Sequence, residues 1–473
     1  MKVTDPWKKL LAALAAGGMF ASSTGYAANF NQNVVVNGGF ENVDPNTLGS
    51  YHGPKILDWT VGVVPGFAYS HDGSTTTDVD GTYTIPNYAD GTPPPNAGHW
   101  YLSTNNAGGA AIPRIDAPGK FYQDINVSTG DTGDLIRTGG AKINLSAYMS
   151  SYLNDADFGS VHADFRNSQG VSLGTTVIND SDPGPANVWN LNTGSATIPA
   201  GTATVRVSVY GTKVGPGDGG DGYVDNVDVQ LTVPSLALVV NRANGNISLK
   251  NFTNSNVNLS AYSITSAFEA MSTTSWLSIA DNYDSGNPGA NQVDSAHAWS
   301  KLTSPTAHTD LSEADLQTGL GATLANNKVI NLGNGDWIQN PNEDLVFQYI
   351  SDGQIKTGLV AFIGNNNLPF ASGDLNVDGF INTADWAILR TNQLTNLSSN
   401  SLAQAYRLGD LTGDKLSNHA DFVAFKSAYD VANGAGSFVA MLASTAVPEP
   451  SSALLILAAG TFILPALRRR STR

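Results

Sequence analysis

The chain has 473 residues and no cysteine, only 14% of its residues are charged, and 49 are glycine. Its length predicts two or three domains, and its abundance of Gly, Asn, Ser and Thr predicts mainly β structure. The net charge of −16 excludes nucleic acid as a partner because it repels phosphate, and the lack of cysteine excludes disulfides, thiolate nucleophiles and cysteine-ligated zinc.

Residues 1–28 have the pattern of a secretory signal peptide. Lysines within the first nine residues precede an apolar stretch from Leu10 to about Ala21, and the small residues Gly25 and Ala27 follow. A membrane anchor needs about 20 apolar residues, and this stretch is shorter. We therefore expect cleavage near Ala27 or Ala28 and export of the remaining chain.

From Asn33 to Val233, short alternating segments are separated by Gly, Pro and Asn. Apolar residues recur at every second position, which is typical of half-buried strands. The clearest segments are 143–147, 161–165, 205–209 and 227–233. Many short strands at this spacing predict a β-sandwich or jelly roll. The motifs Val36–Glu41 and Tyr223–Val227 resemble those of galactose-binding-like jelly rolls, and that resemblance implies sugar binding in many members.

A sugar site in this domain would need aromatic platforms for pyranose rings, with amide or carboxylate groups beside them. The candidate carbohydrate-binding residues are Trp59, Trp100, Tyr101 and Trp189, and the candidate polar partners are Asn105, Asn106 and Asp124. The alternative is that these rings pack in the core, since large rings dominate sandwich interiors.

The same resemblance implies a structural calcium site where the first and last strands of the jelly roll meet. Its candidate ligands are Asn37, Glu41 and Asp225. Calcium prefers carboxylate and amide oxygens of this kind.

Residues 236–370 carry a second β pattern. Ile247 and Leu249 alternate with Ser248 and Lys250. In the same way, Leu345, Phe347 and Tyr349 alternate with Val346 and Gln348. We expect another small sandwich, which resembles spacer modules found beside dockerin-like repeats in large secreted proteins. No activity is implied by this resemblance, and we interpret the segment as a scaffold.

Residues 372–432 contain two copies of a calcium-loop pattern. In the first copy, oxygen side chains stand at loop positions 1, 3, 5, 9 and 12, position 7 would offer its carbonyl to the ion, and Gly379 allows a sharp turn. The predicted ligands of the first copy are Asp374, Asn376, Asp378, Phe380, Asn382 and Asp385, and those of the second are Asp410, Thr412, Asp414, Leu416, Asn418 and Asp421. Helices are expected after each loop, over 386–394 and 422–429.

Two loop-helix units at this spacing resemble a type I dockerin. The resemblance implies a calcium-ordered helical module that docks onto cohesin domains. The second loop departs from the pattern, because Thr412 replaces Asp or Asn and Lys415 replaces the turn glycine and adds a positive charge. We expect weaker calcium binding there. The alternatives are a structural calcium module without a cohesin, or a polar turn without calcium.

Residues 447–473 form a three-part tail: Val447–Ser451, with the letters VPEPS, precede an apolar run from Ala453 to Leu467, and three arginines follow. The run could just cross a thin bilayer with the arginines on the cytoplasmic side. The arrangement resembles the PEP-CTERM sorting signal, which implies recognition by an exosortase membrane protease at a cell surface that produces exopolysaccharide. A plain tail anchor is the alternative.

The sequence contains no assembled catalytic motif: its His residues show no His-Glu-x-x-His pairing, and there is no Gly-x-Ser-x-Gly elbow. We therefore expect a non-catalytic protein of the cell surface or matrix that binds carbohydrate or protein. The alternative is a dockerin-bearing polysaccharide-degrading enzyme, whose paired carboxylates would lie within the jelly roll.

Overall fold

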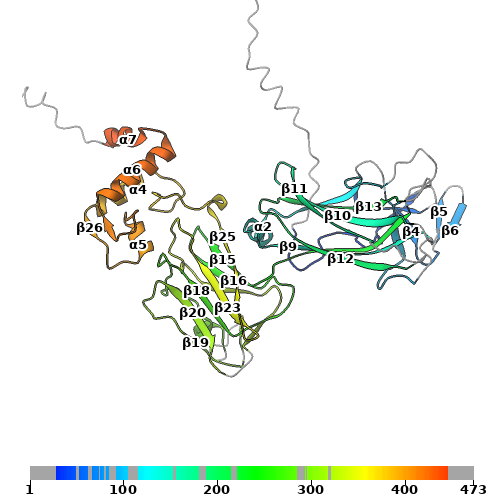
Figure 1. Ribbon diagram of the computed structural model, residues 1–473, viewed down its shortest axis with the longest axis horizontal. Coiled ribbons are helices and arrows are strands. Elements are labelled where there is room, and N and C mark those ends of the chain that lie inside the picture. The colour runs from blue at the N-terminus through cyan, green and yellow to red at the C-terminus, as the bar shows by residue number, and fades with distance from the viewer. Residues whose placement is uncertain are drawn as a thin grey trace, which may run out of the picture.

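The computed structural model describes residues 28–48, 53–61, 66–73, 75–78, 81–84, 92–104, 115–152, 156–180, 188–214, 221–284, 293–294, 296–317 and 321–445. Figure 1 shows two bodies built of β-sheet and a cluster of helices, in chain order. The fold is mainly β, as the composition predicts. The predicted signal peptide up to residue 27 and the predicted sorting tail lie outside the described residues.

The first body is a sandwich of two antiparallel sheets. The seven-stranded sheet runs in the order β1 (Val43–Leu48), β2 (Pro54–Ile56), β4 (Phe67–Ser70), β7 (Trp100–Ser103), β14 (Gly222–Thr232), β9 (Lys142–Ser151) and β12 (Asn190–Thr197). The five-stranded sheet runs in the order β11 (Ser172–Asn179), β10 (Phe158–Arg166), β13 (Thr204–Thr212), β8 (Phe121–Asn126) and β3 (Thr60–Val61). A short hairpin, β5 (Thr75–Asp78) and β6 (Gly81–Thr84), and helix α2 (Gly130–Arg137) complete it.

The alternation read from the sequence decides which residues fill this sandwich. The apolar positions of 143–147, 161–165, 205–209 and 227–233 are all buried in one cluster, so those strand predictions are confirmed. Each of these segments places its intervening polar residues on the opposite, outer face of its sheet, because side chains alternate along a strand. The outer faces therefore carry the polar and aromatic side chains from which a site can be built.

The second body contains a four-stranded sheet, a five-stranded sheet and a small pair. The four-stranded sheet comprises β22 (Val329–Gly333), β16 (Ile247–Lys250), β15 (Ala237–Asn241) and β25 (Leu359–Ile363), with β15 and β25 parallel. The five-stranded sheet comprises β19 (Trp299–Lys301), β20 (Asp310–Asp315), β18 (Ala261–Thr265), β23 (Val346–Ser351) and β24 (Gln354–Thr357), and β17 (Val257–Leu259) pairs with β21 (Ala322–Leu324). Short helices lie at Ile279–Asn282 (α3) and Asn365–Asn367 (η1).

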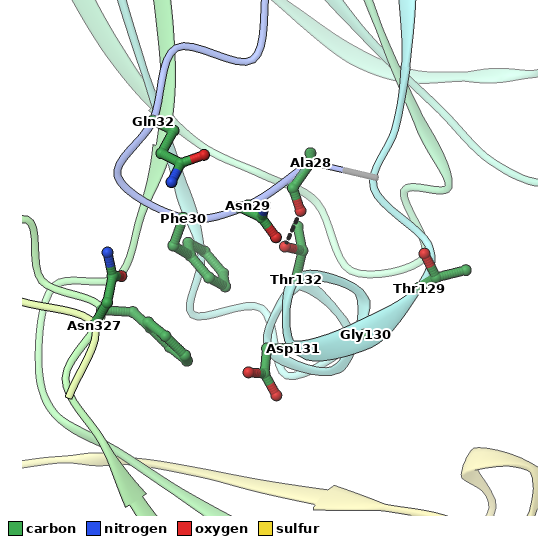
Figure 2. Close-up of a pocket in the computed structure, with 10 residues that line it drawn as sticks. Ala28, Asn29, Phe30, Gln32, Thr129, Gly130, Asp131, Thr132 and Asn327 are labelled. Carbon is green, nitrogen blue, oxygen red and sulfur yellow. Dashed lines mark hydrogen bonds between the residues drawn. The ribbon is translucent and has the colours of Figure 1, made fainter. Parts of the chain in front are cut away.

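The two sandwiches meet at α2 and the start of the described chain. Phe30 stacks on Phe252 of the second sandwich with 5.1 Å between ring centroids, and Lys250 pairs with Asp131. Figure 2 shows a pocket of about 360 Å³ at this junction, where Thr132 donates a hydrogen bond to the carbonyl of Ala28 at 2.6 Å. The stacked rings and the ion pair hold the two bodies together.

The third part contains helices α4 (Thr383–Asn392), α5 (Leu402–Arg407), α6 (His419–Asn433) and α7 (Ser437–Thr445), with a two-residue pair formed by β26 (Thr395–Asn396) and β27 (Leu416–Ser417). Helices α4 and α6 begin earlier than the apolar pattern predicts, because Asn382 and Asn418 cap them. Leu375, Leu389, Phe425 and Phe438 form the core. In the described part of the chain, no helix combines the length and apolar character needed to span a membrane.

Candidate ligand-binding and metal sites

An aromatic cluster covers part of the outer face of the seven-stranded sheet. Tyr69, Tyr101 and Tyr223 come from the neighbouring strands β4, β7 and β14, and Trp189 lies just before β12. Tyr101 is 5.4 Å from Tyr223 and 5.3 Å from Trp189 between ring centroids. Trp100 and Tyr148 pack at the edge of the cluster and are half-buried. The cluster thus consists of four buried rings and of two rings, Trp100 and Tyr148, that are partly open to solvent.

The four predicted platforms have different surroundings. Trp59 is a core residue, not a platform: it is 5% exposed, stacks on Phe121 at 5.0 Å and donates its indole N–H to the carbonyl of Asn37. Tyr101 and Trp189 lie in the aromatic cluster but are buried, and of the four only Trp100 is partly open. The core-packing interpretation therefore holds for Trp59.

The predicted polar partners do not join these rings. Asp124 lies on the five-stranded sheet, where it accepts hydrogen bonds from Arg206 Nε at 2.7 Å and Nη2 at 2.6 Å, and the guanidinium lies 3.8 Å above the Tyr122 ring. Grouping Asp124 with the platforms was therefore wrong, because β8 belongs to the other sheet of the sandwich. Asn105 and Asn106 lie outside the described residues.

A buried His–Asp pair lies beside the aromatic cluster. His71 Nε2 is 3.0 Å from Asp225 Oδ2, and the Asp225 side chain is fully buried. Burial raises the pKa of Asp225 to about 6, although the contact with His71 opposes that rise. The His71 ring also packs 4.7 Å from Tyr101 and 5.2 Å from Trp189. The pair thus anchors the cluster to β14.

A polar groove of about 420 Å³ continues along the same face. It is lined by hydroxyl, amide and carboxylate side chains from β9, β12 and β14: Asn144, Ser146, Thr193, Ser195, Asp228 and Gln230. Ser146 stands opposite both Asp228 and Thr193 in the sheet register, and Tyr148 is the next outward residue of β9. Burial raises the pKa of Asp228. A half-open ring therefore lies about 7 Å along the strand from the groove.

The sequence did not single out Tyr148 or these groove residues. Tyr148 follows Ser146 in the outward half of the 143–149 alternation, so the pattern already placed it on the outer face. The alternation does not give the strand order. In the structure β9 lies between β14 and β12, and this order brings the groove residues together.

Glu41, Asn37 and Asp225 are each occupied by protein contacts. Glu41 accepts hydrogen bonds from the backbone N–H groups of His99 and Trp100 at 2.8–3.1 Å. The Asn37 side chain bonds the backbone of residues 42 and 57, and Asp225 contacts His71. These hydrogen bonds stabilise the loop around residues 37–42 and link β14 to His71, and the structural calcium site at the three residues stays a prediction.

The first calcium-type loop buries its two end carboxylates. Asp374 and Asp385 are both 0% exposed. Asp374 accepts from the backbone N–H groups of residues 378 and 379, and Asp385 from those of residues 375, 376 and 382, at 2.8–3.1 Å. Burial, with the nearby charges of Asp385 and Asp378, raises the pKa of Asp374 to about 6. Among the described ion pairs, none neutralises these two carboxylates.

The other predicted ligands of this loop are placed around it. The Asn376 amide donates to Asp378 Oδ2 at 2.8 Å, and Asn382 caps helix α4. The Phe380 side chain is exposed. This is compatible with its predicted role, in which only the backbone carbonyl would contact the ion. Gly379 has a φ of 92°, which explains the preference for glycine there.

The second loop repeats this geometry with other residues. One oxygen each of Asp410, Asp414 and Asp421 lies within 4.8 Å of the others, and the Thr412 hydroxyl contacts Asp421 Oδ1 at 3.0 Å. Asn418 caps helix α6 and donates to Asp414 at 3.0 Å. The Leu416 backbone N–H donates to Asp414 Oδ1 at 2.9 Å.

Lys415 has a different role from the one the sequence indicates. Its backbone adopts a left-handed φ of 59° at the glycine position. Its ammonium donates to Glu269 Oε2 of the second sandwich at 2.9 Å, and the same oxygen accepts from the Leu402 N–H that begins helix α5. The lysine thus joins the helical module to the sandwich through an ion pair.

Both loops fit a hard divalent cation in their donor chemistry. Buried carboxylates and adjacent amide oxygens are the ligands that calcium prefers. Leaving several of them unneutralised in the interior would be costly. When bound, calcium would supply the charge that holds each loop closed.

No family model and no curated protein matches the sequence. Solved structures match parts of it. The CBM22-1 xylan-binding domain of Xyn10C from Paenibacillus barcinonensis is 12% identical and covers 40% of this chain and 96% of its own, with a TM-score of 0.20. A putative sugar binding protein from Bacteroides thetaiotaomicron is 13% identical over 42% of this chain and 99% of its own, with a TM-score of 0.20.

The enzymatically active domain of bacteriophage CBA120 tailspike protein 4 is 15% identical over 43% of this chain, with a TM-score of 0.24. The present chain spans only 23% of that protein. Similarities of this size assign neither a family nor a function.

Proposed function

We propose that this chain is an exported, non-catalytic protein of the cell surface or extracellular matrix that binds carbohydrate on the outer face of its seven-stranded sheet. The observation that carries the proposal is the half-open ring of Tyr148 beside a groove lined by hydroxyl, amide and carboxylate groups. Ligand sites typically combine such apolar surface with a few polar groups that fix orientation.

The buried aromatic cluster supports Tyr148 in this role. Tyr148 packs at its edge, with Tyr101, Tyr223 and Trp189 behind it. A ring held by packing loses little conformational entropy when a sugar stacks on it. Asp228 and Gln230, which bond each other at 2.8 Å, offer acceptors and a donor to sugar hydroxyls.

The test is affinity electrophoresis of the exported chain through gels that contain different soluble polysaccharides. Tyr148→Ala is compared with Tyr122→Ala, because Tyr122 is also a half-buried outward tyrosine but lies on the other sheet. We expect Tyr148→Ala to weaken binding about tenfold, which is about 1.4 kcal/mol, and Tyr122→Ala to leave it unchanged. Equal effects of the two variants would place the site elsewhere, and the absence of retardation in every gel would refute carbohydrate binding.

We further propose that calcium orders the helical module, which resembles a dockerin. The buried end carboxylates of the two loops support this proposal, and the first loop remains the expected tighter site because its side-chain ligands are all Asp or Asn. Calcium titration of the exported chain by calorimetry, with Asp374→Ala and Asp410→Ala, tests it. Each variant should lose one site, and Asp374→Ala should lose the tighter. An unchanged titration in both variants would exclude the loops as calcium sites.

Partner docking and sorting complete the proposal. A cohesin-like partner would contact loop positions 10 and 11, which are Thr383 and Ala384 in the first repeat and His419 and Ala420 in the second, so that only position 10 differs between the repeats. An exosortase-like protease would process the tail at the inner membrane. Mass spectrometry of the surface-exposed protein tests whether the tail is removed. A retained Arg473 would favour a plain membrane anchor.

A polysaccharide-degrading enzyme is the alternative function, and one observation favours it: the raised pKa of Asp225 close to the groove. However, Asp225 is fully buried and contacts His71, so the side chain does not reach the groove surface. If the protein released reducing ends from a bound polysaccharide, and Asp225→Asn did not, the chain would be an enzyme.

A further inference from the structure

Three side chains of mixed chemistry converge at one edge of the second sandwich. Asp294 and His297 lie on the segment that leads into β19, and Asp315 is the last residue of β20. Trp299 pairs with Asp315 in the sheet register, which brings the two segments together. One potential ligand atom of each of the three residues lies within 4.8 Å of the others.

The two atoms that face each other most closely have no hydrogen-bond partner. His297 Nδ1 and Asp315 Oδ2 are both buried and neither makes a hydrogen bond, although they are only 3.4 Å apart. The Asp315 side chain is only 1% exposed. A charge-assisted N–H···O bond would be about 2.7–2.9 Å long, so this is not one. Leaving such groups unsatisfied costs about 1–3 kcal/mol each, a cost that a cation bound between the two atoms would remove.

The spacing of these atoms matches a tetrahedral metal centre. Zinc bonds to imidazole nitrogen and carboxylate oxygen are about 2.0–2.2 Å long, so two ligand atoms on a tetrahedron are about 3.3–3.5 Å apart. The distance from His297 Nδ1 to Asp315 Oδ2 is 3.4 Å, and that to Asp294 Oδ2 is 3.9 Å. The first distance already fits, and the second needs a shift of about half an ångström, which is small for side chains of this length.

The surrounding hydrogen bonds hold Asp294 in position. Its Oδ1 accepts from the backbone N–H groups of Ala296 and His297 at 2.9 and 3.1 Å, and its Oδ2 accepts from the Trp299 indole at 3.1 Å. The Trp299 backbone N–H is in turn bound by Asp284 at 2.9 Å. Outer hydrogen bonds of this kind orient the ligands of metal sites.

We infer that Asp294, His297 and Asp315 form a binding site for a divalent transition metal of the zinc class. One imidazole and two carboxylates suit zinc better than calcium, which takes oxygen ligands only. With a neutral imidazole the two buried carboxylates carry a charge of −2, which a divalent cation neutralises. The site is separate from the calcium-type loops and ties the β19–β20 edge to the segment after α3, in a chain that has no disulfides.

Cobalt titration of the exported chain tests the inference. The metal-stripped protein is first saturated with calcium, so that the oxygen-only loops are filled, and Co²⁺ is then added while the visible absorption of tetrahedral cobalt is followed. We expect one saturable site from which one equivalent of Zn²⁺ displaces the cobalt. The absence of a saturable cobalt spectrum in the unmutated protein would overturn the inference.

Variants locate the site. His297→Gln and Asp315→Asn should each weaken cobalt binding at least tenfold. The matched control is His99→Gln. His99 also lies 2.7 Å from a carboxylate, Asp72, but this pair is exposed and is not part of a three-ligand group among the described residues. The His99→Gln variant should bind cobalt as the unmutated protein does. Circular dichroism checks that each variant is folded. A spectrum that survives both His297→Gln and Asp315→Asn would contradict the assignment.

Discussion

Replacing Asp336 by asparagine should stabilise the second sandwich at high pH and much less at low pH. Asp336 is fully buried, and neither of its carboxylate oxygens has a hydrogen-bond partner. It lies against Gly333, where an added Cβ would be 1.4 Å from Asp336 Oδ2. Burial raises its pKa from the ordinary value of 3.8 to about 7, because the charged form loses its hydration.

The sign of the effect follows from proton linkage. Between pH 3.8 and about 7 the folded state holds a proton that the unfolded state has released, so the free energy of unfolding falls as the pH rises through this range. Above pH 7 the full cost of the buried charge is present. Each pH unit corresponds to about 1.4 kcal/mol, so about 3 kcal/mol should be lost between pH 5 and pH 9. Asparagine does not ionise and avoids this loss.

The assay is denaturant unfolding of the unmutated protein and of Asp336→Asn at pH 5 and pH 9, followed by tryptophan fluorescence. Trp337, next in the sequence, is buried and serves as a reporter. The difference between the two proteins should grow by about 3 kcal/mol from pH 5 to pH 9, equivalent to about 6–12 °C in melting temperature for a domain of this size. An equal difference at both pH values would refute the argument that Asp336 is a buried, unpaired carboxyl group.

Three further substitutions test other parts of the structure by denaturant unfolding. Lys415→Gly should be about 1 kcal/mol more stable than Lys415→Ala. Both variants lose the ion pair, but only glycine relieves the strain of the left-handed backbone at this position. Equal stabilities would argue against backbone strain at residue 415. Gly98→Ala should destabilise the first sandwich by about 1–3 kcal/mol, since φ is 67° and a Cβ would lie 2.4 Å from the Glu41 carboxyl; a neutral effect would contradict this packing. Trp59→Ala should lower the free energy of unfolding by about 3–5 kcal/mol, because it truncates a core residue. Trp100→Ala should lower it less, because Trp100 is half-buried. The reverse order would contradict the assignment of Trp59 to the core.

Features that depend on neighbouring residues could be predicted from the sequence alone. The alternation in 143–147 and 205–209 predicts strands and their buried faces, because side chains on a strand point to opposite sides in turn. The two loops predict the turn at Gly379 and the helices that follow. The predicted starts of the two helices are too late, because Asn382 and Asn418 cap the helices within the loops.

Features that depend on contacts between distant residues came only from the tertiary structure. Strand order places Tyr148 beside Asp225 and Ser146 beside Asp228, and it separates Asp124 from the aromatic cluster. The contact between Lys415 and Glu269 joins residues 146 positions apart. Local sequence determines periodicity and turns, whereas a site is made of side chains whose proximity depends on how sheets pair and pack. For that reason the sequence predicted the strands, the helices and the turn at Gly379, and only the fold showed the groove, the His–Asp pair and the Asp294–His297–Asp315 cluster.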